Sequence, residues 1–375
     1  MALTFTTDIS QTVLLDSYVN NVVEFESDNA SDAFKCTINI DGSVFEITPN
    51  NNTFYFNFKS VFKSLINDYF EDAIDVELDP NDLTTFIKDM SQVTKALTID
   101  FVVDFVNGTS ETASRSVTLL QSSSNFQDRK KREILKLDSF AVLSNLEDKS
   151  NRTFRAVYFE GYPFDIQVYK NTPGNVVLTN KTNLLDVTFN LPNKVNRIFF
   201  SDAETDTTLE DVLPLVEGTN QLEFDTGDLT TVLLEKRSGL CGVYLKWKNN
   251  FGGWSYWLFE RKHKVERKTK NLGFINNDYQ NLENNNYIKN IGKTSFDTYN
   301  IGSINVDVTD QELVLSILES PKVYMFMGVD FAKDETTDWL SVNLDTDSAI
   351  VKGYKDRPMD VSFDIELPER NTLVL

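Results

Sequence analysis

The single histidine and the two cysteines of this chain limit the chemistry that it can perform. His263 lies in the basic run Arg-Lys-His-Lys-Val-Glu-Arg-Lys, without a neighbouring carboxylate that would orient its ring as a general base. We interpret it as a solvated histidine on a charged strand edge. With no second histidine, Ser–His–Asp and Cys–His mechanisms are not expected. Cys36 and Cys241 supply neither a disulfide framework nor, with one histidine, the four ligands of a structural zinc site.

Carboxylates are abundant, but their pattern indicates no particular site. A glycosidase requires two carboxyl groups about 5–9.5 Å apart, a spacing that sequence alone does not show. Two clusters, 202–206 and 345–347, offer oxygen ligands for calcium but lack the twelve-residue loop pattern with its glycine and terminal glutamate. Solvated loops are the preferred interpretation of both. Phosphate-binding patterns of the GxGxxG or GxxxxGK[ST] type are missing as well. We therefore expect no enzyme and no cofactor.

Charge and composition narrow the class of protein further. The chain has 375 residues, with 36 basic residues against 57 acidic ones and a net charge of −21, which disfavours binding to nucleic acid. Hydrophobic residues make up 41% and include 28 Phe and 13 Tyr, enough for substantial cores. No stretch approaches the roughly 18 apolar residues of a membrane span. The first residues do not look like a signal peptide, so we expect a protein made in a reducing compartment.

The most distinctive segment is an aromatic hairpin between residues 240 and 259, which contains three of the four tryptophans. Strands over 242–248 and 254–259 are predicted on either side of an Asn/Gly-rich turn. Aromatic residues occur on both faces of the second strand, so neither face is simply exposed to water. One face would pack on its own domain, and the other would stack a sugar ring or dock a protein, although burial of both faces in a core is the simpler alternative. The candidate residues are Tyr244, Trp247, Phe251, Trp254, Tyr256 and Trp257.

Two basic runs contrast with the acidic chain. Candidate contact residues are Arg129, Lys130, Lys131 and Arg132 in the first run, and Arg261, Lys262 and Lys264 in the second, which extends to residue 270. Such runs suit an acidic neighbour, including another copy of this chain. A solvated linker and a solvated hairpin strand explain them equally well, so both interpretations stay open.

The elements that would position these residues are mainly β-strands. Apolar and polar residues alternate over 36–40, 54–58 and 97–105, as in half-buried strands. One helix interrupts them, at about 59–71, with an apolar face. Its residues are Val61, Phe62, Leu65, Ile66, Tyr69 and Phe70.

We predict a mainly β fold with two β-sandwich-like domains and a small C-terminal α+β domain with one helix against a sheet. Residues 1–125 form the first sandwich, 126–270 an all-β domain ending in the aromatic hairpin, 271–291 an Asn-rich loop or arm, and 292–375 the α+β domain. Thr309 and Glu312 match a capping box that would begin the C-terminal helix, and Ser320-Pro321 would end it.

The motif Lys-Trp-x-Asn-x-x-Gly-Gly-x-x-Tyr-Trp-Leu-Phe, which spans residues 246–259, resembles a signature of structural tail proteins from tailed phages and prophages of Bacteroidetes bacteria. The passages 58–66, 320–323, 339–342 and 361–367 are similar to theirs, so the resemblance touches all three predicted domains. It implies a baseplate or distal-tail-like protein of the virion tail, assembled in the host cytoplasm. Its partners would be copies of itself and other tail proteins, and it would carry no catalytic residues.

Three hypotheses follow, in order of preference. The first is a non-enzymatic structural protein of a phage tail baseplate or tail tip, which assembles into a ring or adaptor. The alternative is a carbohydrate- or receptor-binding module for host attachment, in which the Trp-rich hairpin contacts a surface glycan. A carboxylate-dependent glycosidase has no specific support from the residues.

Overall fold

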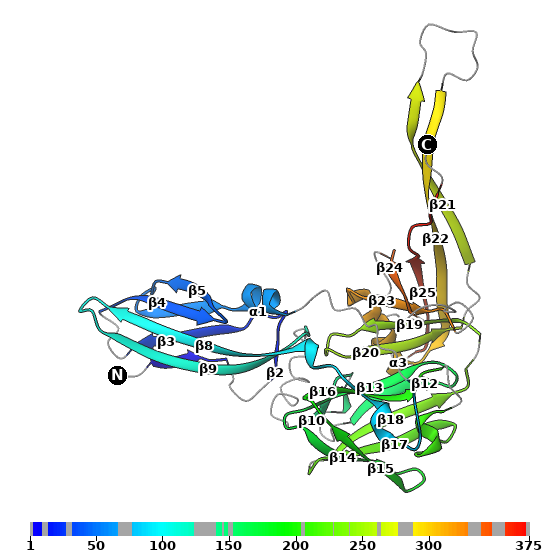
Figure 1. Cartoon of the computed structure of the whole chain (residues 1–375), viewed down its shortest axis with the longest axis horizontal. Coiled ribbons are helices and arrows are strands. Elements are labelled where there is room, and N and C mark those ends of the chain that lie inside the picture. Colours follow the sequence, from blue (N-terminus) through cyan, green and yellow to red (C-terminus); the bar gives the residue numbers. More distant parts are fainter. Residues whose placement is uncertain are drawn as a thin grey trace. The chain divides into compact units, whose positions relative to one another are not determined.

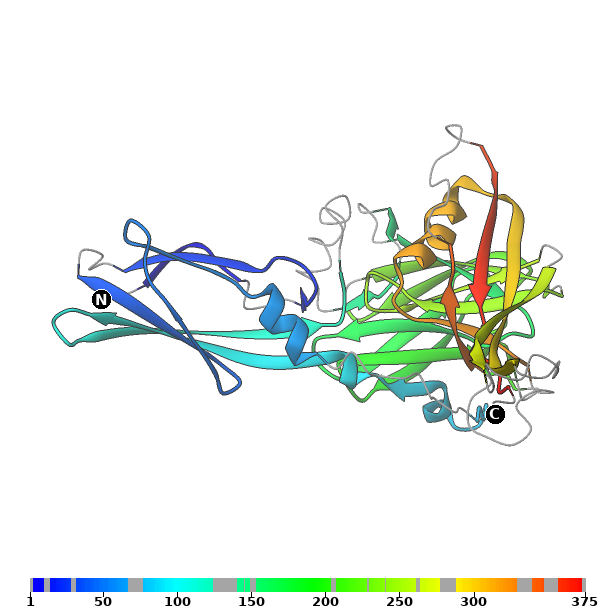
Figure 2. The ribbon, with the colours of Figure 1, turned by 90° about the horizontal axis from the view of Figure 1, so that it is seen from above.

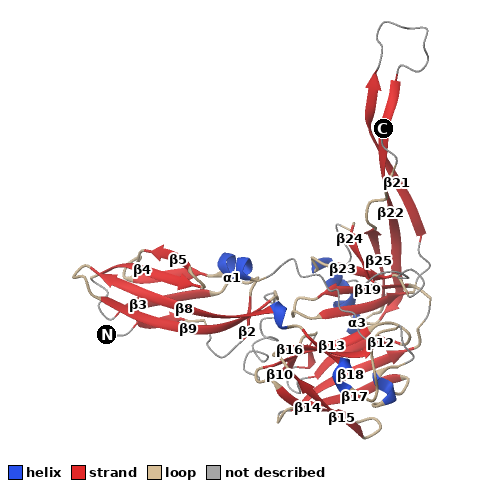
Figure 3. Cartoon of the chain, viewed as in Figure 1, coloured by secondary structure: helices blue, strands red, loops and turns tan. Residues whose placement is uncertain are grey.

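The fold is mainly β, as the sequence predicts (Figures 1 and 3). The chain divides into two compact units. A computed structural model of the chain describes residues 3–9, 14–27, 32–66, 77–123, 140–144, 146–148, 153–203, 207–227, 229–239, 241–260, 264–276, 288–328, 339–346 and 357–372. Unit 1 comprises Met1–Ala156, Pro163–Lys236 and Asn250–Gly253. Unit 2 comprises Val157–Tyr162, Arg237–Asn249 and Trp254–Leu375.

The N-terminal part of unit 1 is a β-sandwich of a three-stranded and a five-stranded sheet. The first has the order β1 (Leu3–Thr7), β3 (Val22–Ser27), β6 (Thr53–Asn57), and the second β2 (Leu14–Asp16), β9 (Ser110–Leu120), β8 (Thr94–Phe105), β4 (Ala33–Ile40), β5 (Ser43–Ile47). Phenylalanines from both sheets meet between them. The ring of Phe25 lies 5.2 Å from that of Phe54 in its own sheet and 5.4 Å from that of Phe101 in the other. The alternating patterns in the sequence thus predict these strands correctly.

Helix α1 (Lys59–Leu65) closes the same core (Figure 2). It begins where the sequence predicts, directly after β6, and its side chains Val61 and Phe62 are buried with the phenylalanines of the sandwich. Ile66 follows the helix and joins this core. The expected continuation through Tyr69 and Phe70 falls outside the described residues.

A second pair of sheets completes unit 1. One has the order β10 (Phe140–Val142), β13 (Phe164–Lys170), β16 (Val195–Ser201), β7 (Ile87–Asp89). The other has the order β11 (Leu146–Asp148), β12 (Thr153–Phe159), β18 (Leu229–Arg237), β17 (Gly218–Asp225), β14 (Gly174–Asn180), β15 (Leu185–Leu191). Short 3-10 helices cover Leu83–Phe86, Ser91–Val93 and Leu209–Asp211. The rings of Phe140 and Phe224, 5.4 Å apart, join the two sheets.

Unit 2 contains a seven-stranded sheet, and helix α3 (Val308–Leu315) packs against it. Its order is β20 (Trp254–Phe259), β19 (Val243–Lys248), β23 (Val323–Phe326), β24 (Trp339–Leu344), β25 (Met359–Glu366), β22 (Ile288–Val306), β21 (Lys264–Asn276). The helix continues as a 3-10 helix (Ser316–Glu319) and ends at Ser320, as predicted. Its N-cap is Asp307 rather than Thr309, because the chain turns into the helix directly after β22, two residues earlier than the capping-box pattern suggests.

The position of the aromatic hairpin corrects the predicted domain assignment. Strands β19 and β20 match the predicted hairpin, but they pair into the C-terminal sheet instead of ending a separate domain over 126–270. Residues 271–276 and 288–291, expected in a loop or arm, belong to strands β21 and β22. The sheet curls so that β20 packs on β22 and β25, which the Phe259–Phe363 ring contact at 5.8 Å demonstrates. Long-range strand pairing of this kind is not encoded in local patterns.

Candidate functional site: the β21–β22 ribbon

The six aromatic residues predicted as a contact platform are buried. Their residue exposures range from 0% for Trp247 to 5% for Trp254. The Nε1 group of Trp247 donates a hydrogen bond to Ser316 Oγ at 2.9 Å, and that of Trp257 donates one to Ser303 Oγ at 2.8 Å. The expected sugar- or protein-stacking face therefore does not exist on this hairpin. The simpler alternative, burial in a core, is correct.

On the face of the hairpin that contains Lys246, three aromatic rings surround the ammonium group of this lysine. Lys246 is 2% exposed, and its Nζ lies 4.1 Å from the ring centroid of Trp339. The same ammonium group lies 5.4 Å from the ring of Tyr324 and 5.5 Å from that of Trp254. Cation–π contacts of this type stabilise a desolvated ammonium group. The rings are thus occupied by an internal contact.

Arg237 connects the aromatic hairpin with helix α3. Its guanidinium group donates a 2.6 Å hydrogen bond to Asp310, whose side chain is 1% exposed, and lies 5.1 Å from the ring of Trp257. A buried carboxylate needs such a partner, because desolvation of an unpaired charge is costly. The pair fixes the helix in its place within unit 2.

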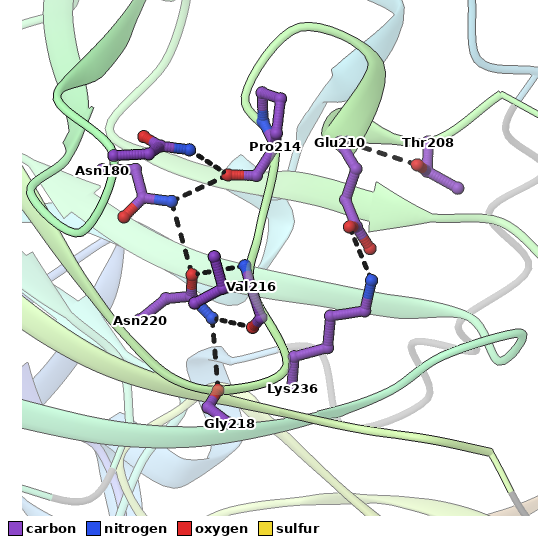
Figure 4. A network of polar contacts seen from close by, with 9 residues as sticks. Asn180, Thr208, Glu210, Pro214, Val216, Gly218, Asn220 and Lys236 are labelled. Carbon is purple, nitrogen blue, oxygen red and sulfur yellow. Dashed lines mark hydrogen bonds and ion pairs between the residues drawn. The ribbon is translucent and has the colours of Figure 1, made fainter.

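A buried amide network in unit 1 is also structural (Figure 4). Asn180 and Asn220 are fully buried, and the Nδ2 group of Asn180 donates to the carbonyl oxygen of Pro214 at 2.8 Å. Asn220 accepts from the amide of Val216 at 2.9 Å and donates to the carbonyl oxygens of Val216 and Gly218. Backbone groups of the loop before β17 and of its first residue thus pair with both side chains, and the network holds this loop in place.

Of the predicted basic contacts, only Lys264 belongs to the described residues. Arg129, Lys130, Lys131, Arg132, Arg261 and Lys262 lie outside them, as does His263. Lys264 begins strand β21 and forms an exposed ion pair with Glu266. The hydrogen bond to Glu266 raises the pKa of the Lys264 ammonium group.

Strand β21 and the first half of β22 form a two-stranded ribbon that extends from the sheet of unit 2 (Figure 1). β21 is an edge strand, so β22 is its neighbour on one side only. β22 continues past the ribbon into the sheet, where Thr298–Val306 pairs with β25. The two strands of the ribbon contain six basic residues and two acidic ones, a net charge of +4, so the rest of the chain carries −25. The most basic described segment is therefore also the most exposed strand of the unit.

Exposed apolar side chains distinguish the far half of this ribbon. Leu272, Phe274 and Ile275 are 48%, 62% and 44% exposed. Because successive residues of a strand point to opposite faces, Phe274 and Ile275 place apolar surface on both sides of the ribbon. Sequence reasoning missed these residues by expecting a loop here. The pattern Leu-Gly-Phe-Ile between the lysines and the asparagines was the available signal.

Two opposed register shifts mark where this half begins. Asn271 pairs with Lys293 and Gly273 with Gly292, but Phe274 pairs with Asn290, so each strand has one extra residue. Gly273 and Gly292 adopt φ values of +147° and +155°, which favour glycine. The bulges separate the apolar far half from the charged base of the ribbon.

Asp297 braces the base of the ribbon. Its carboxylate accepts hydrogen bonds from Arg267 Nε at 2.7 Å and from Arg370 Nη1 at 2.9 Å. These bonds hold the pKa of Asp297 below its ordinary value of 3.8, and the bond from Arg267 has the larger effect. The C-terminal segment thereby contacts the ribbon, and the backbone amide of Arg370 donates to the carbonyl oxygen of Ser295.

The described residues contain neither a metal-binding cluster nor a membrane-spanning helix. Within the described ranges, no group of three or more His, Cys, Asp or Glu side chains is placed to hold a metal ion. No helix of these ranges has the length and apolar composition needed to cross a bilayer.

Comparisons with known proteins identify no family. No family model matches the chain, and no curated protein matches it. Among solved structures, fibronectin(III)-like modules of Clostridium thermocellum CbhA share 7% identity, with 63% of this chain and 95% of that chain covered and a TM-score of 0.21. A Ca²⁺-stabilised adhesin of an Antarctic bacterium shares 8%, covering 82% and 70%, with a TM-score of 0.18. Carbohydrate-binding modules of the β-sandwich superfamily share 8%, covering 100% and 94%, with a TM-score of 0.19. At these TM-scores the likeness supports no inference about function.

Replacing Trp257 tests its burial. We expect Trp257→Ala to lower the free energy of unfolding by about 3–5 kcal/mol, because it removes a packed ring and a buried hydrogen bond. Tyr55→Ala, which truncates an aromatic residue that is 59% exposed, should change it by no more than about 0.5 kcal/mol. Urea denaturation followed by circular dichroism measures both. Equal stability of the two variants would show that Trp257 is not a core residue.

Removing the carboxylate at the ribbon base should loosen the ribbon. We expect Asp297→Asn to increase proteolytic cleavage within residues 264–276 about two- to fivefold at neutral pH, because the two arginines lose their charged acceptor. Asp307→Asn, at an exposed position of the same unit, is the matched control.

The effect should depend on pH with a defined sign. The pKa of Asp297 is lowered in the folded protein, so its bracing is complete above pH 3.8 and disappears as the pH falls through the lowered value. The ratio of cleavage rates, variant to wild type, should therefore approach one in strong acid. A ratio that stays constant with pH would contradict this role of Asp297.

Proposed function

We propose that this protein is a non-enzymatic assembly subunit that binds neighbouring polypeptides through its β21–β22 ribbon. The single observation that carries the proposal is the composition of the ribbon: an edge strand that pairs on one side, apolar side chains on both faces and a positive charge, in an otherwise strongly acidic chain.

The apolar far half of the ribbon favours a protein partner. An isolated two-stranded ribbon is at best marginally stable in water and gains stability from a third strand or a packed surface. Clustered exposed side chains such as Leu272, Phe274 and Ile275 mark interaction sites more often than free surface. The ribbon is therefore expected to be stabilised by contact with a neighbour.

The charge of the ribbon selects the kind of neighbour. A net charge of +4 on two strands attracts an acidic surface. Nucleic acid is a poor candidate, because the remaining −25 would repel its phosphates. A second copy of this chain and other acidic proteins satisfy the requirement.

A role in a phage tail is the most specific form of this proposal. The sequence resemblance to baseplate and distal-tail-like proteins implies repeated contacts between copies of the subunit and with other tail proteins, in the virion tail. A mainly β subunit with a projecting ribbon suits such repeated contacts. We propose this role, with assembly in the host cytoplasm.

The binding site predicted for the alternative role, host attachment, is buried. The Trp-rich hairpin was expected to contact a surface glycan, but its six aromatic residues are in the core. A glycan-binding role would require another surface, and no described feature favours one.

Shortening the ribbon tests the proposed function. In the variant, an Asn-Gly turn replaces residues 271–293 and joins Lys270 to Thr294, which are paired in the ribbon. We expect the full chain to form a discrete oligomer at micromolar concentration and the shortened chain to associate at least about tenfold more weakly, while both retain the same thermal transition. Mass photometry over a concentration series measures the association, and circular dichroism the folding.

Two results would contradict the proposal. One is equal assembly of the shortened and full chains, which would place the interface elsewhere. The other is a full chain that stays monomeric throughout the series, which would exclude self-association through the ribbon.

A further inference from the structure

We infer that the outer edge of β21 receives an acidic strand from a second copy of this chain, in a head-to-tail contact. The inference rests on the proposed function and specifies its partner and geometry. Three observations support it: the exposed edge of β21, the basic side chains along that strand, and the net negative charge of the rest of the chain.

The edge itself is long and uncovered. β21 has 13 residues, which correspond to about 40 Å of backbone. Among the strands that the structure describes, only β22 pairs with it, and its described side chains from Lys264 to Ile275 are exposed, except at the half-buried Gly273. Edge strands present a row of N–H and C=O groups to which another strand can add. No proline interrupts this row in β21.

The side chains of β21 exclude pairing with another β21. The strand has four basic residues and one acidic residue, so an antiparallel β21–β21 contact would bring like charges opposite one another. Such cross-strand pairs are destabilising. A symmetric contact through this edge is therefore disfavoured, and the incoming strand must differ from β21.

The charge balance favours a second copy as the source of that strand. Outside the ribbon each copy carries a net charge of −25. The rest of a neighbouring copy is therefore, on average, opposite in charge to the ribbon. Edge strands are available on it. One of them, β5, has Val44 exposed at 61% and an exposed Glu46, which forms an ion pair with Lys35 within the chain. When the ribbon of one copy binds a different surface of a second copy, the pair still has one free ribbon and one free receiving surface. Such a contact therefore propagates into a ring or a filament.

A mixing experiment tests this geometry. The shortened chain lacks the apolar far half of the ribbon but retains its acidic surfaces, so it should still accept the ribbon of a full-length copy. We label the shortened chain with a fluorophore, titrate it with unlabelled full-length protein and follow fluorescence anisotropy. Head-to-tail contact predicts saturable binding, and excess shortened chain should cap the oligomers and reduce their size.

Two full-length variants provide the charge test. Lys270→Glu/Lys293→Glu reverses two exposed charges of the ribbon outside the ion pairs that Asp297, Asp345 and Glu266 form. Lys59→Glu/Lys181→Glu makes the same change of net charge at exposed positions of unit 1. We expect at least a tenfold loss of affinity for the first variant and an unchanged affinity for the second.

Hydrogen exchange distinguishes strand addition from side-chain contact. Residues 271–276 occur only in the full-length copy, so their peptides report on the ribbon of the complex. In the free ribbon alternate amides of β21 face outward, and strand addition should slow their exchange.

Three results would overturn the inference while leaving the proposed function intact. In the first, the shortened chain does not bind the full-length chain although the full-length chain self-associates. In the second, the Lys270→Glu/Lys293→Glu variant binds the shortened chain as tightly as wild type does. In the third, hydrogen exchange in residues 271–276 does not change on binding. Loss of self-association by the full chain itself would instead refute the proposed function.

Discussion

Strand β22 is the element on which the arrangement of unit 2 depends. Its C-terminal half, from Thr298 to Val306, pairs with β25, and Ser303 accepts a hydrogen bond from the indole of Trp257 in the core. Its N-terminal half leaves the sheet paired with β21, and near the base it also contacts Arg370. Because one continuous strand of 19 residues spans both regions, the ribbon is anchored in a packed core and is still exposed at its far end. A ribbon supported in this way can transmit a contact to the body of the unit.

Charge and packing act together at this ribbon. The base is braced by Asp297 between Arg267 and Arg370 and carries the basic residues of β21, whereas the far half has exposed apolar side chains. The lysines oppose pairing between two identical edges, whereas the apolar side chains favour contact with a suitable neighbour. The same features that keep the edge from aggregating with itself thus select an acidic partner. An acidic chain with one basic, exposed element is consistent with a subunit that binds another copy of the same chain in a fixed orientation.

Local patterns in the sequence predicted the strands and the start of helix α1, because alternation and helical spacing follow from which residues are buried. The burial of the aromatic hairpin was not predictable from local patterns, since its covering groups, such as Ser303, Phe363 and Trp339, come from strands 46 to 104 residues further along the chain. The far half of the ribbon, within residues 271–291, was predicted as an Asn-rich loop or arm, because an exposed strand needs no alternation and this segment contains little that could be buried. The domain assignment failed for the same reason, as pairing between β19 and β23 joins distant segments.

The most direct test of this account is the structure of the assembled protein, determined by electron cryomicroscopy of the oligomer. The account predicts that the ribbon of each subunit lies against the next subunit around the assembly, with Leu272, Phe274 and Ile275 covered and a strand of that neighbour paired to β21. An assembly whose contacts involve other surfaces, with the ribbon extending into solvent, would contradict it.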